Sequence, residues 1–184
     1  MKHIMLDLET LSTEPNAMIT AIGAVVMDFE QGCLREAFEA QVDIESYSGV
    51  DGFHMSPSTV KWWLSQDKDA QRHMLSNTMS VDTALFQFMG WAHAITDYKP
   101  KELIVWGNGA EFDSPILRNA LLRRFDSSDI WDFRNDRCYR TVKAVFPKIE
   151  VQTPPLVSHR ALDDAKYQAL YLLELHKHVG LWLP

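Results

Sequence analysis

The first ten residues of the chain constrain its fold more than any other stretch. Ile4, Leu6 and Leu8 alternate with other residues, a polar turn-like segment follows, and no helical period fits, so these residues predict a β-strand. Side chains alternate between the two faces of a strand, which puts the carboxylates of Asp7 and Glu9 on one side, roughly 7 Å apart. Two carboxylates on one face of a buried strand are costly to desolvate unless a cation neutralises them.

Carboxylate oxygens at this spacing suit a divalent cation such as Mg²⁺ or Mn²⁺. The alternative is that Asp7 and Glu9 merely mark the end of a strand that reaches solvent. The first strand alone does not decide between the two interpretations. A metal site requires further ligands from elsewhere in the chain.

The bulk composition is that of one ordinary domain. The chain has 184 residues, of which 46% are hydrophobic and 23% charged, a balance typical of a folded globular protein. No apolar run reaches membrane-spanning length and the N-terminus lacks a signal-peptide profile, so we expect a cytoplasmic protein that does not associate with membranes. Cys33 and Cys138 have no metal-like spacing and are expected to be free thiols.

The net charge of −7 argues against broad non-specific binding of nucleic acid. The charge is unevenly spread, because residues 1–98 hold 5 Lys/Arg against 14 Asp/Glu, whereas residues 99–184 hold 13 against 11. A locally basic surface in the second half of the chain is therefore compatible with the composition.

Apolar periodicity and turn residues predict the remaining elements. In chain order they are strands over 18–27 and 34–42 joined by a hairpin, a helix opened by Ser56 and Pro57, a helix over 81–95, a strand over 101–106, a helix over 115–124, a small strand around Ile130, Trp131 and Phe133, and helices over 138–146 and 160–179. Three antiparallel strands followed by strand–helix alternation predict an α/β fold with a mixed sheet covered by helices. The first strand is expected to be central, because both the hairpin and the later parallel strand need it as a neighbour.

A second acidic site follows the strand over 101–106. Asn108 and Asp113 lie where that strand ends and a helix begins, a common place for functional groups in open sheets. Asp113 itself can act as a helix cap. Ser114, adjacent to Pro115, is the better cap by position, which leaves Asp113 available for other chemistry.

A third site opens the last helix. At about 100° per residue, one apolar face of this helix contains Ala161, Leu162, Ala165, Ala169, Leu172 and Leu173. Asp164 lies at the edge of that face and can point toward the first strand, whereas Asp163 falls on the opposite side. His159 precedes the helix and accompanies Asp164, which distinguishes it from the other histidines of the chain.

These three motifs, Asp-x-Glu, Asn-x-x-x-Phe-Asp and His-x-x-x-x-Asp, resemble those of the DEDDh, or DnaQ-like, 3′–5′ exonucleases. The resemblance extends from about residue 3 to 176. Among these exonucleases, the chain is similar to the compact bacterial and phage branch, which includes exodeoxyribonuclease VIII-like enzymes and exoribonucleases. It implies a ribonuclease H-like mixed sheet forming a single exonuclease domain over residues 1–184. The sister class has a tyrosine at the position of Arg160, so the chain resembles the histidine class.

The resemblance implies a role for each matching residue. The four acids Asp7, Glu9, Asp113 and Asp164 match the metal-binding positions, and His159 matches the general base. Two divalent cations, Mg²⁺ or Mn²⁺, would be bound, with Asp7 shared between them. Hydrolysis of the 3′-terminal phosphodiester by this two-metal mechanism would release nucleoside 5′-monophosphates.

The substrate contacts are expected around the same site. By resemblance, Thr10 and Leu11 line the terminal nucleotide, Phe112 contacts a sugar or base, and Asn108 braces the second acidic site. Trp62 and Trp63 can stack on a base, as aromatic platforms do on single strands, or belong to the core; we expect one of them to be buried and the other exposed. Six arginines can follow phosphates or form a solvated basic face: Arg118, Arg123, Arg124, Arg134, Arg137 and Arg140.

The sequence thus predicts a metal-dependent exonuclease that degrades single-stranded DNA or RNA from its 3′ end. DNA and RNA both stay open, because that choice depends on contacts to the 2′-hydroxyl. Two alternatives are a catalytically inactive nucleic-acid-binding protein and a mononucleotide phosphatase on a similar site. The resemblance also implies a homodimer, although no residue pattern indicates one.

Overall fold

A five-stranded mixed sheet forms the centre of the protein in the computed structural model, which describes residues 1–75, 79–146 and 148–180. The strands are β1 (Lys2–Thr10), β2 (Ile19–Asp28), β3 (Cys33–Gln41), β4 (Leu103–Gly107) and β5 (Asp136–Cys138). Their order across the sheet is β3-β2-β1-β4-β5, so β1 is central as the sequence predicts. It pairs antiparallel with β2 and parallel with β4.

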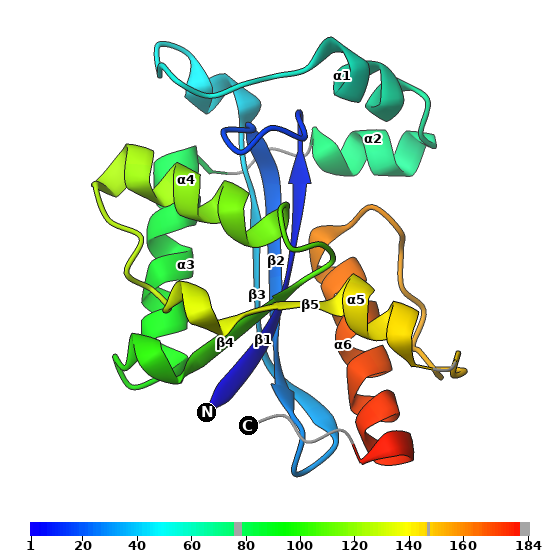
Figure 1. The fold of residues 1–184 in the computed structure, drawn as a ribbon. Helices are drawn as coiled ribbons and strands as arrows, with labels where there is room; N and C mark the ends of the chain where they lie inside the picture. The colour runs from blue at the N-terminus through cyan, green and yellow to red at the C-terminus, as the bar shows by residue number, and fades with distance from the viewer. Residues whose placement is uncertain (76–78, 147, 181–184) are drawn as a thin grey trace.

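Helices cover both faces of this sheet (Figure 1). The α-helices are α1 (Pro57–Leu64), α2 (Lys68–Met74), α3 (Val81–Ile95), α4 (Asp113–Phe125), α5 (Tyr139–Val145) and α6 (Ala161–Val179). Short 3₁₀ helices are η1 (Ile44–Tyr47), η2 (Pro100–Glu102) and η3 (Phe133–Asn135). Figure 1 shows α3 and α4 on one face of the sheet and α5 and α6 on the other. Within the described ranges, no helix combines the length and apolarity needed to span a membrane.

The alternation of side chains along β1 divides the core into two layers. Ile4, Leu6 and Leu8 are buried in the layer that packs against α3 and α4. Met5 is buried on the opposite face, in the layer formed with α5 and α6. Because alternate residues share a face, Asp7 and Glu9 continue the Met5 side and face α6.

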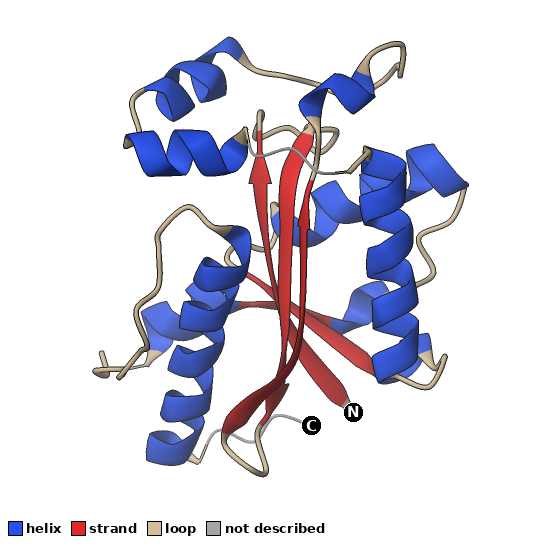
Figure 2. Ribbon diagram, turned by 180° about the vertical axis from the view of Figure 1, so that it is seen from behind, coloured by secondary structure: helices blue, strands red, loops and turns tan. Residues whose placement is uncertain are grey.

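Helices α1 and α2 lie beyond the end of β1 and cover it from above (Figures 1 and 2). Trp63 attaches α1 to the strand: its indole N–H donates to the carbonyl of Thr10 at 2.9 Å, and its side chain is buried. Helix α1, which Ser56 and Pro57 predict, therefore also covers the space beside Glu9.

Three details of the expected secondary structure are wrong. Ile130 and Trp131 are buried in a turn, and the last strand of the sheet is β5, a few residues later. Helix α4 begins at Asp113 and not after it, so Ser114 is not its cap. Helix α2 was not expected from the sequence. The expected free thiols are confirmed, because Cys33 and Cys138 form no disulfide.

Gly23 allows α6 to reach the sheet. A Cβ atom at this position would lie 2.2 Å from backbone atoms of Ala161 and Leu162, far inside van der Waals contact. Gly23 is also the register partner of Asp7 in the β1–β2 pair. The absence of a side chain at Gly23 therefore brings the first turn of α6, which carries Asp164, next to the acidic part of β1.

We predict that Gly23→Ala displaces the first turn of α6, lowers stability by about 1–3 kcal/mol through overpacking, and reduces any activity that needs Asp164 beside Glu9. Urea denaturation and an activity assay measure the two effects. Gly90→Ala in α3 is the matched control, because no atom lies within 4 Å of a Cβ there. Alanine at this helical position is expected to be neutral or stabilising. Equal behaviour of the two variants would contradict the role given to Gly23.

Candidate active site

A cavity of about 650 Å³ opens between β1, α1, α5 and α6. Asp7, Glu9, His159 and Asp164 all line it, although they come from opposite ends of the sequence. The three motifs of the sequence therefore meet at one place, where β1 passes beneath α1 and the start of α6.

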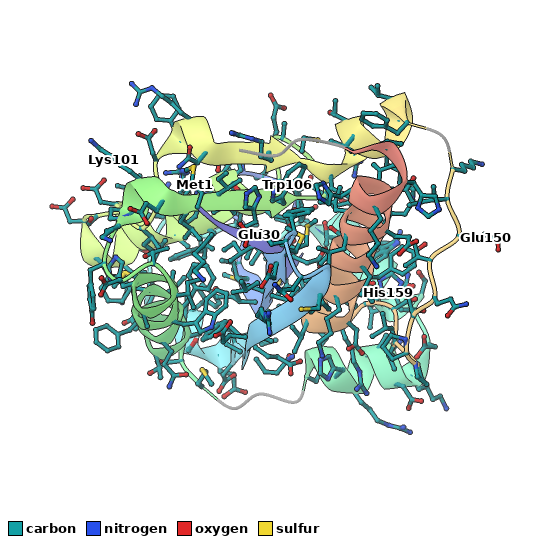
Figure 3. All side chains as sticks on the ribbon, turned by 90° about the horizontal axis from the view of Figure 1, so that it is seen from below. Met1, Glu30, Lys101, Trp106, Glu150 and His159 are labelled. Atoms are coloured by element: carbon teal, nitrogen blue, oxygen red, sulfur yellow. The ribbon has the colours of Figure 1, made fainter. Side chains whose placement is uncertain are left out.

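The beginning of α6 places His159 and Asp164 against Glu9. One potential ligand atom from each of Glu9, His159 and Asp164 lies within 4.8 Å of the other two. His159 has a left-handed backbone (φ 63°), and its N–H donates to Oδ2 of Asp164 at 2.9 Å. Figure 3 shows His159 at the start of α6. Asp163 turns away from this group, because its carboxylate accepts from the backbone N–H of Val157 at 3.1 Å.

Asp113 joins the site from the other side of β1. Its Oδ1 accepts from the N–H of Leu8 at 3.1 Å and its Oδ2 from the N–H of Asn108 at 2.9 Å. The side chain is 1% exposed, and burial raises its pKa to about 6 although both backbone hydrogen bonds oppose the shift. Each carboxylate oxygen of Asp113 thus accepts one backbone hydrogen bond, from β1 or from the end of β4, and keeps a lone pair for a cation.

Burial raises the pKa of each of the other three acids, and neighbouring carboxylates add to the shift. The pKa of Asp7 is raised well above its usual value by burial first and then by Asp113, Glu9 and Asp164. The pKa of Glu9 rises to about 8, again through burial first, then through Asp164 and Asp113. Burial also raises the pKa of Asp164, against the hydrogen bond from His159. Within the described part of the chain, no Lys or Arg forms an ion pair with any of the four.

This donor set fits a divalent cation. Four carboxylates offer hard oxygen ligands, and burial raises the pKa of each of them, so their ionised forms are disfavoured without a cation. A bound cation supplies that charge and favours the ionised carboxylates. Oxygen donors of this kind suit both Mg²⁺ and Mn²⁺.

Gln168 is a member of the site that the sequence motifs do not include. Its Nε2 donates to Oδ1 of Asp7 at 2.8 Å, and the side chain is buried. Its Oε1 has no hydrogen-bond partner among the described residues. Gln168 follows Asp164 by four residues, so the two share one face of α6. That spacing is the signal in the sequence that indicates its position.

Some of the residues that are expected to contact the substrate line the cavity. Trp63 is 2% exposed and Trp62 is 44% exposed, which confirms that one tryptophan is buried and the other is not. Trp62 lines the cavity with its ring centroid 5.1 Å from that of His159, in an edge-on arrangement. Thr10 also lines the cavity. Leu11 does not, because it is buried in a small apolar cluster with Trp63.

The second acidic motif contributes two further lining residues. Asn108 and Phe112 both border the cavity, as expected. Asn108 braces the site through its backbone, since its N–H holds Asp113. Phe112 occupies the position before α4 and packs partly against the core.

Most of the candidate phosphate-binding arginines have partners within the protein. Arg118 pairs with Asp136, Arg124 with Asp82, and Arg134 with Asp132. The guanidinium groups of Arg123 and Arg137 donate to Asn119 and to backbone carbonyls. Arg140 lies over Gly109 and lowers the pKa of Asp113. These contacts favour a structural basic face over a continuous phosphate track.

The architecture is that of nucleases of known structure. The crystal structure of cell-death related nuclease 4 (CRN-4) is similar at a TM-score of 0.61 and 17% identity, over 97% of this chain and 64% of that one. E. coli Exonuclease I in complex with a dT13 oligonucleotide is similar at a TM-score of 0.65 and 14% identity, over 96% of this chain and 41% of that one. This chain thus spans less than two thirds of either protein.

A third structure matches over nearly its whole length. The nuclease domain of 3′hExo, a DEDDh family member bound to rAMP, has a TM-score of 0.61 and 13% identity, covering 100% of this chain and 96% of that one. The predicted ribonuclease H-like mixed sheet is confirmed, and the fold is similar to that of this DEDDh nuclease domain.

The family is shown by the sequence itself. Residues 2–176 match the family described as the 3′-5′ exoribonuclease Rv2179c-like domain, and the chain belongs to that family. The description of that family names the 3′–5′ exonuclease activity that the motifs predict. No curated protein sequence matches it.

We predict that the metal-free protein loses stability as pH rises from about 4.5 to about 8. The pKa of Glu9 is higher in the folded state than its ordinary value of 4.5, so the protonated form is favoured by folding and its contribution disappears as pH approaches 8. Melting temperatures measured in EDTA should fall over this range, and Mg²⁺ or Mn²⁺ should restore them at pH 8. Glu9→Gln should flatten the fall. A melting temperature that stays constant in EDTA would contradict the account.

We predict that Gln168→Leu weakens Mn²⁺ binding by about 10–100-fold, the range found when a partner that orients a metal ligand is removed. The leucine keeps the buried volume but cannot donate to Asp7. Titration calorimetry measures the affinity, and circular dichroism shows whether the fold is retained. Gln168→Glu places a further carboxylate beside Asp7 and should lower the stability of the metal-free protein more than Gln168→Leu does. Unchanged Mn²⁺ affinity in Gln168→Leu would show that Asp7 needs no such support.

Proposed function

We propose that this chain hydrolyses single-stranded nucleic acid from its 3′ end to nucleoside 5′-monophosphates, using two divalent cations bound by Asp7, Glu9, Asp113 and Asp164. The observation that carries the proposal is the convergence of Glu9, His159 and Asp164 within 4.8 Å, beside the half-buried Asp7 and the buried Asp113. RNA is the substrate that we propose first, because the family is described as exoribonucleases.

The residues of the chain have separate tasks in this proposal. When bound, the cations supply charge stabilisation to the attacking and leaving oxygens of an in-line phosphoryl displacement. Asp113 keeps a fixed orientation through its two backbone hydrogen bonds, and Gln168 does the same for Asp7. The carboxylates are thus arranged before any ligand binds.

His159 is proposed as the general base. Its backbone is anchored to Asp164, and the rings of Trp62 and Trp63 lie nearly perpendicular to its imidazole, at centroid distances of 5.1 and 6.1 Å. An imidazole held in this way can accept the proton of an attacking water molecule. Its ring also lies close enough to Glu9 and Asp164 to act as a metal ligand, so its role needs a direct test.

The exposed ring of Trp62 is proposed to stack on the 3′-terminal base. Thr10, Asn108 and Phe112 border the same cavity and are proposed to contact the terminal nucleotide. A single domain over residues 1–184, a cytoplasmic location and a homodimer stay predictions; light scattering measures the last of these.

Digestion of matched RNA and DNA strands, each labelled at the 5′ end, tests the proposed function. With Mg²⁺ or Mn²⁺ we expect ladders that shorten from the 3′ end and release nucleoside 5′-monophosphates. Asp7→Asn should lower the rate about 10³-fold or more, since several kcal/mol of charge stabilisation depend on it. Asp163→Asn is the matched control and should keep activity, because Asp163 faces the preceding loop.

Other outcomes of this digestion identify the alternatives. Internal first cuts or metal-independent activity would contradict the proposal. Release of inorganic phosphate from mononucleotides would indicate a phosphatase. Binding of the strands without any cleavage would indicate an inactive nucleic-acid-binding protein.

We predict that His159→Ala lowers turnover by about 10²–10⁴-fold while leaving Mn²⁺ affinity largely intact, as expected when a general base is removed. Single-turnover hydrolysis and titration calorimetry measure the two quantities on the same preparation. Loss of Mn²⁺ binding in this variant would assign His159 to the metal ligands instead.

A further inference from the structure

The α5 side of the cavity carries its positive charge. Among the residues that line the cavity, Lys143 is the single Lys or Arg. Its ammonium lies 5.7 Å from the ring centroid of Tyr139 and 5.8 Å from that of Tyr171, at which distance cation–π attraction favours its placement over the two rings. Within the described ranges, Lys143 forms no ion pair. Its charge is therefore available to a ligand.

Tyr139 adds a hydrogen-bond donor to the same wall. Its side chain is 2% exposed, and its ring packs edge-on against Tyr171 at 5.6 Å. The hydroxyl has no hydrogen-bond partner among the described residues, a costly state for a buried polar group. Burial raises the pKa of Tyr139, so the hydroxyl stays protonated at neutral pH. An anionic oxygen bound at this wall would satisfy it.

Helix α6 defines the order of groups along the cavity. From its N-terminal end the contacts are Trp62 with His159, Glu9 with Asp164, Asp7 with Gln168, and Lys143 with Tyr171. Asp164 and Tyr171 are seven positions apart in α6, a separation of about 10 Å along the helix axis. Trp62 and Lys143 therefore lie on opposite sides of the acidic cluster, in agreement with the positions of α1 and α5 in Figure 1.

We propose that Lys143 and Tyr139 bind a phosphate of the nucleotide chain on the 5′ side of the bond that is cut. This inference rests on the proposed exonuclease function, which places the scissile phosphate at the acidic cluster and the 3′-terminal base at Trp62. A chain that continues past the cluster in the 5′ direction reaches the α5 wall next. Its phosphate meets there the one cationic side chain of the lining and an unsatisfied donor.

Arg140, one residue after Tyr139, is not an equivalent group. It lies over Gly109 near Asp113 and does not line the cavity. The proposed site therefore consists of the two residues one helical turn apart on the inner side of α5.

Two substrates separate this phosphate from the scissile one. The 4-nitrophenyl ester of thymidine 5′-monophosphate contains a scissile phosphodiester and no phosphate on its 5′ side, whereas a short oligonucleotide contains both. Lys143→Met should raise KM for the oligonucleotide about tenfold, the loss expected for a hydrogen bond to a charged group, and leave hydrolysis of the ester unchanged. Tyr139→Phe keeps the ring packing and should have a smaller effect in the same direction.

The dependence on salt gives an independent measurement. Lys143→Met loses one phosphate contact. The slope of the logarithm of the association constant against the logarithm of the salt concentration should therefore decrease in magnitude by about 0.7 for a single strand. Anisotropy of a fluorescent oligonucleotide measures this association constant. Lys148→Met is the matched control: Lys148 is exposed just after α5 and does not line the cavity, so neither KM nor the slope should change.

The outcomes distinguish the two proposals. Equal impairment of ester and oligonucleotide by Lys143→Met would place Lys143 at the scissile phosphate and overturn the inference, as would no effect on either substrate. A wild-type protein that hydrolyses neither substrate would refute the proposed function. The anisotropy measurement still tests the contact of Lys143 in that case, because it requires binding alone.

Discussion

The central physical constraint on this structure is the unfavourable desolvation of the carboxylates on its central strand, β1. Asp7 and Glu9 face α6 from β1, and Asp113 and Asp164 approach them from two helices, so four acids share a largely buried space. Burial raises the pKa of each acid, and repulsion by neighbouring carboxylates raises those of Asp7 and Glu9 further. The chain holds Asp7 and Asp113 with an amide and backbone N–H groups, and a neutral donor of this kind leaves the charge for a cation to compensate.

Several residues outside the acidic cluster serve to assemble it. Gly23 removes the side chain that would keep α6 off the sheet, and α6 then supplies Asp164 and Gln168 from successive turns. Trp63 fixes α1 over the end of β1, which leaves Trp62 exposed beside His159. An acidic site closed on one side by an aromatic ring suits a phosphodiester only when cations are present, because like charges otherwise repel.

Local sequence patterns predicted much of this arrangement. Alternation along β1 was enough to put Asp7 and Glu9 on one face, and the structure places Asp164 rather than Asp163 beside Glu9, as the phase of α6 predicts. Contacts between distant segments were not predictable in the same way. Asp113 resembles a residue next to a cap, yet its carboxylate accepts from Leu8, 105 residues away.

The other missed features have the same physical origin. Ile130 and Trp131 have the composition of a strand, but their burial comes from a turn packed on the core. The hydrogen bond of Gln168 and the wall formed by Lys143 and Tyr139 arise where α5 and α6 meet the sheet.

Proton release on Mn²⁺ binding tests the central claim most directly, because it reports whether the carboxyl groups are protonated before the cation binds. With the pKa of Glu9 near 8, this group is mostly protonated at pH 7, and a bound cation must displace its proton. Calorimetric titrations at pH 7 in buffers of different ionisation enthalpy should show about one proton or more released per protein, and less at pH 9. Binding heats that are independent of the buffer would contradict the account.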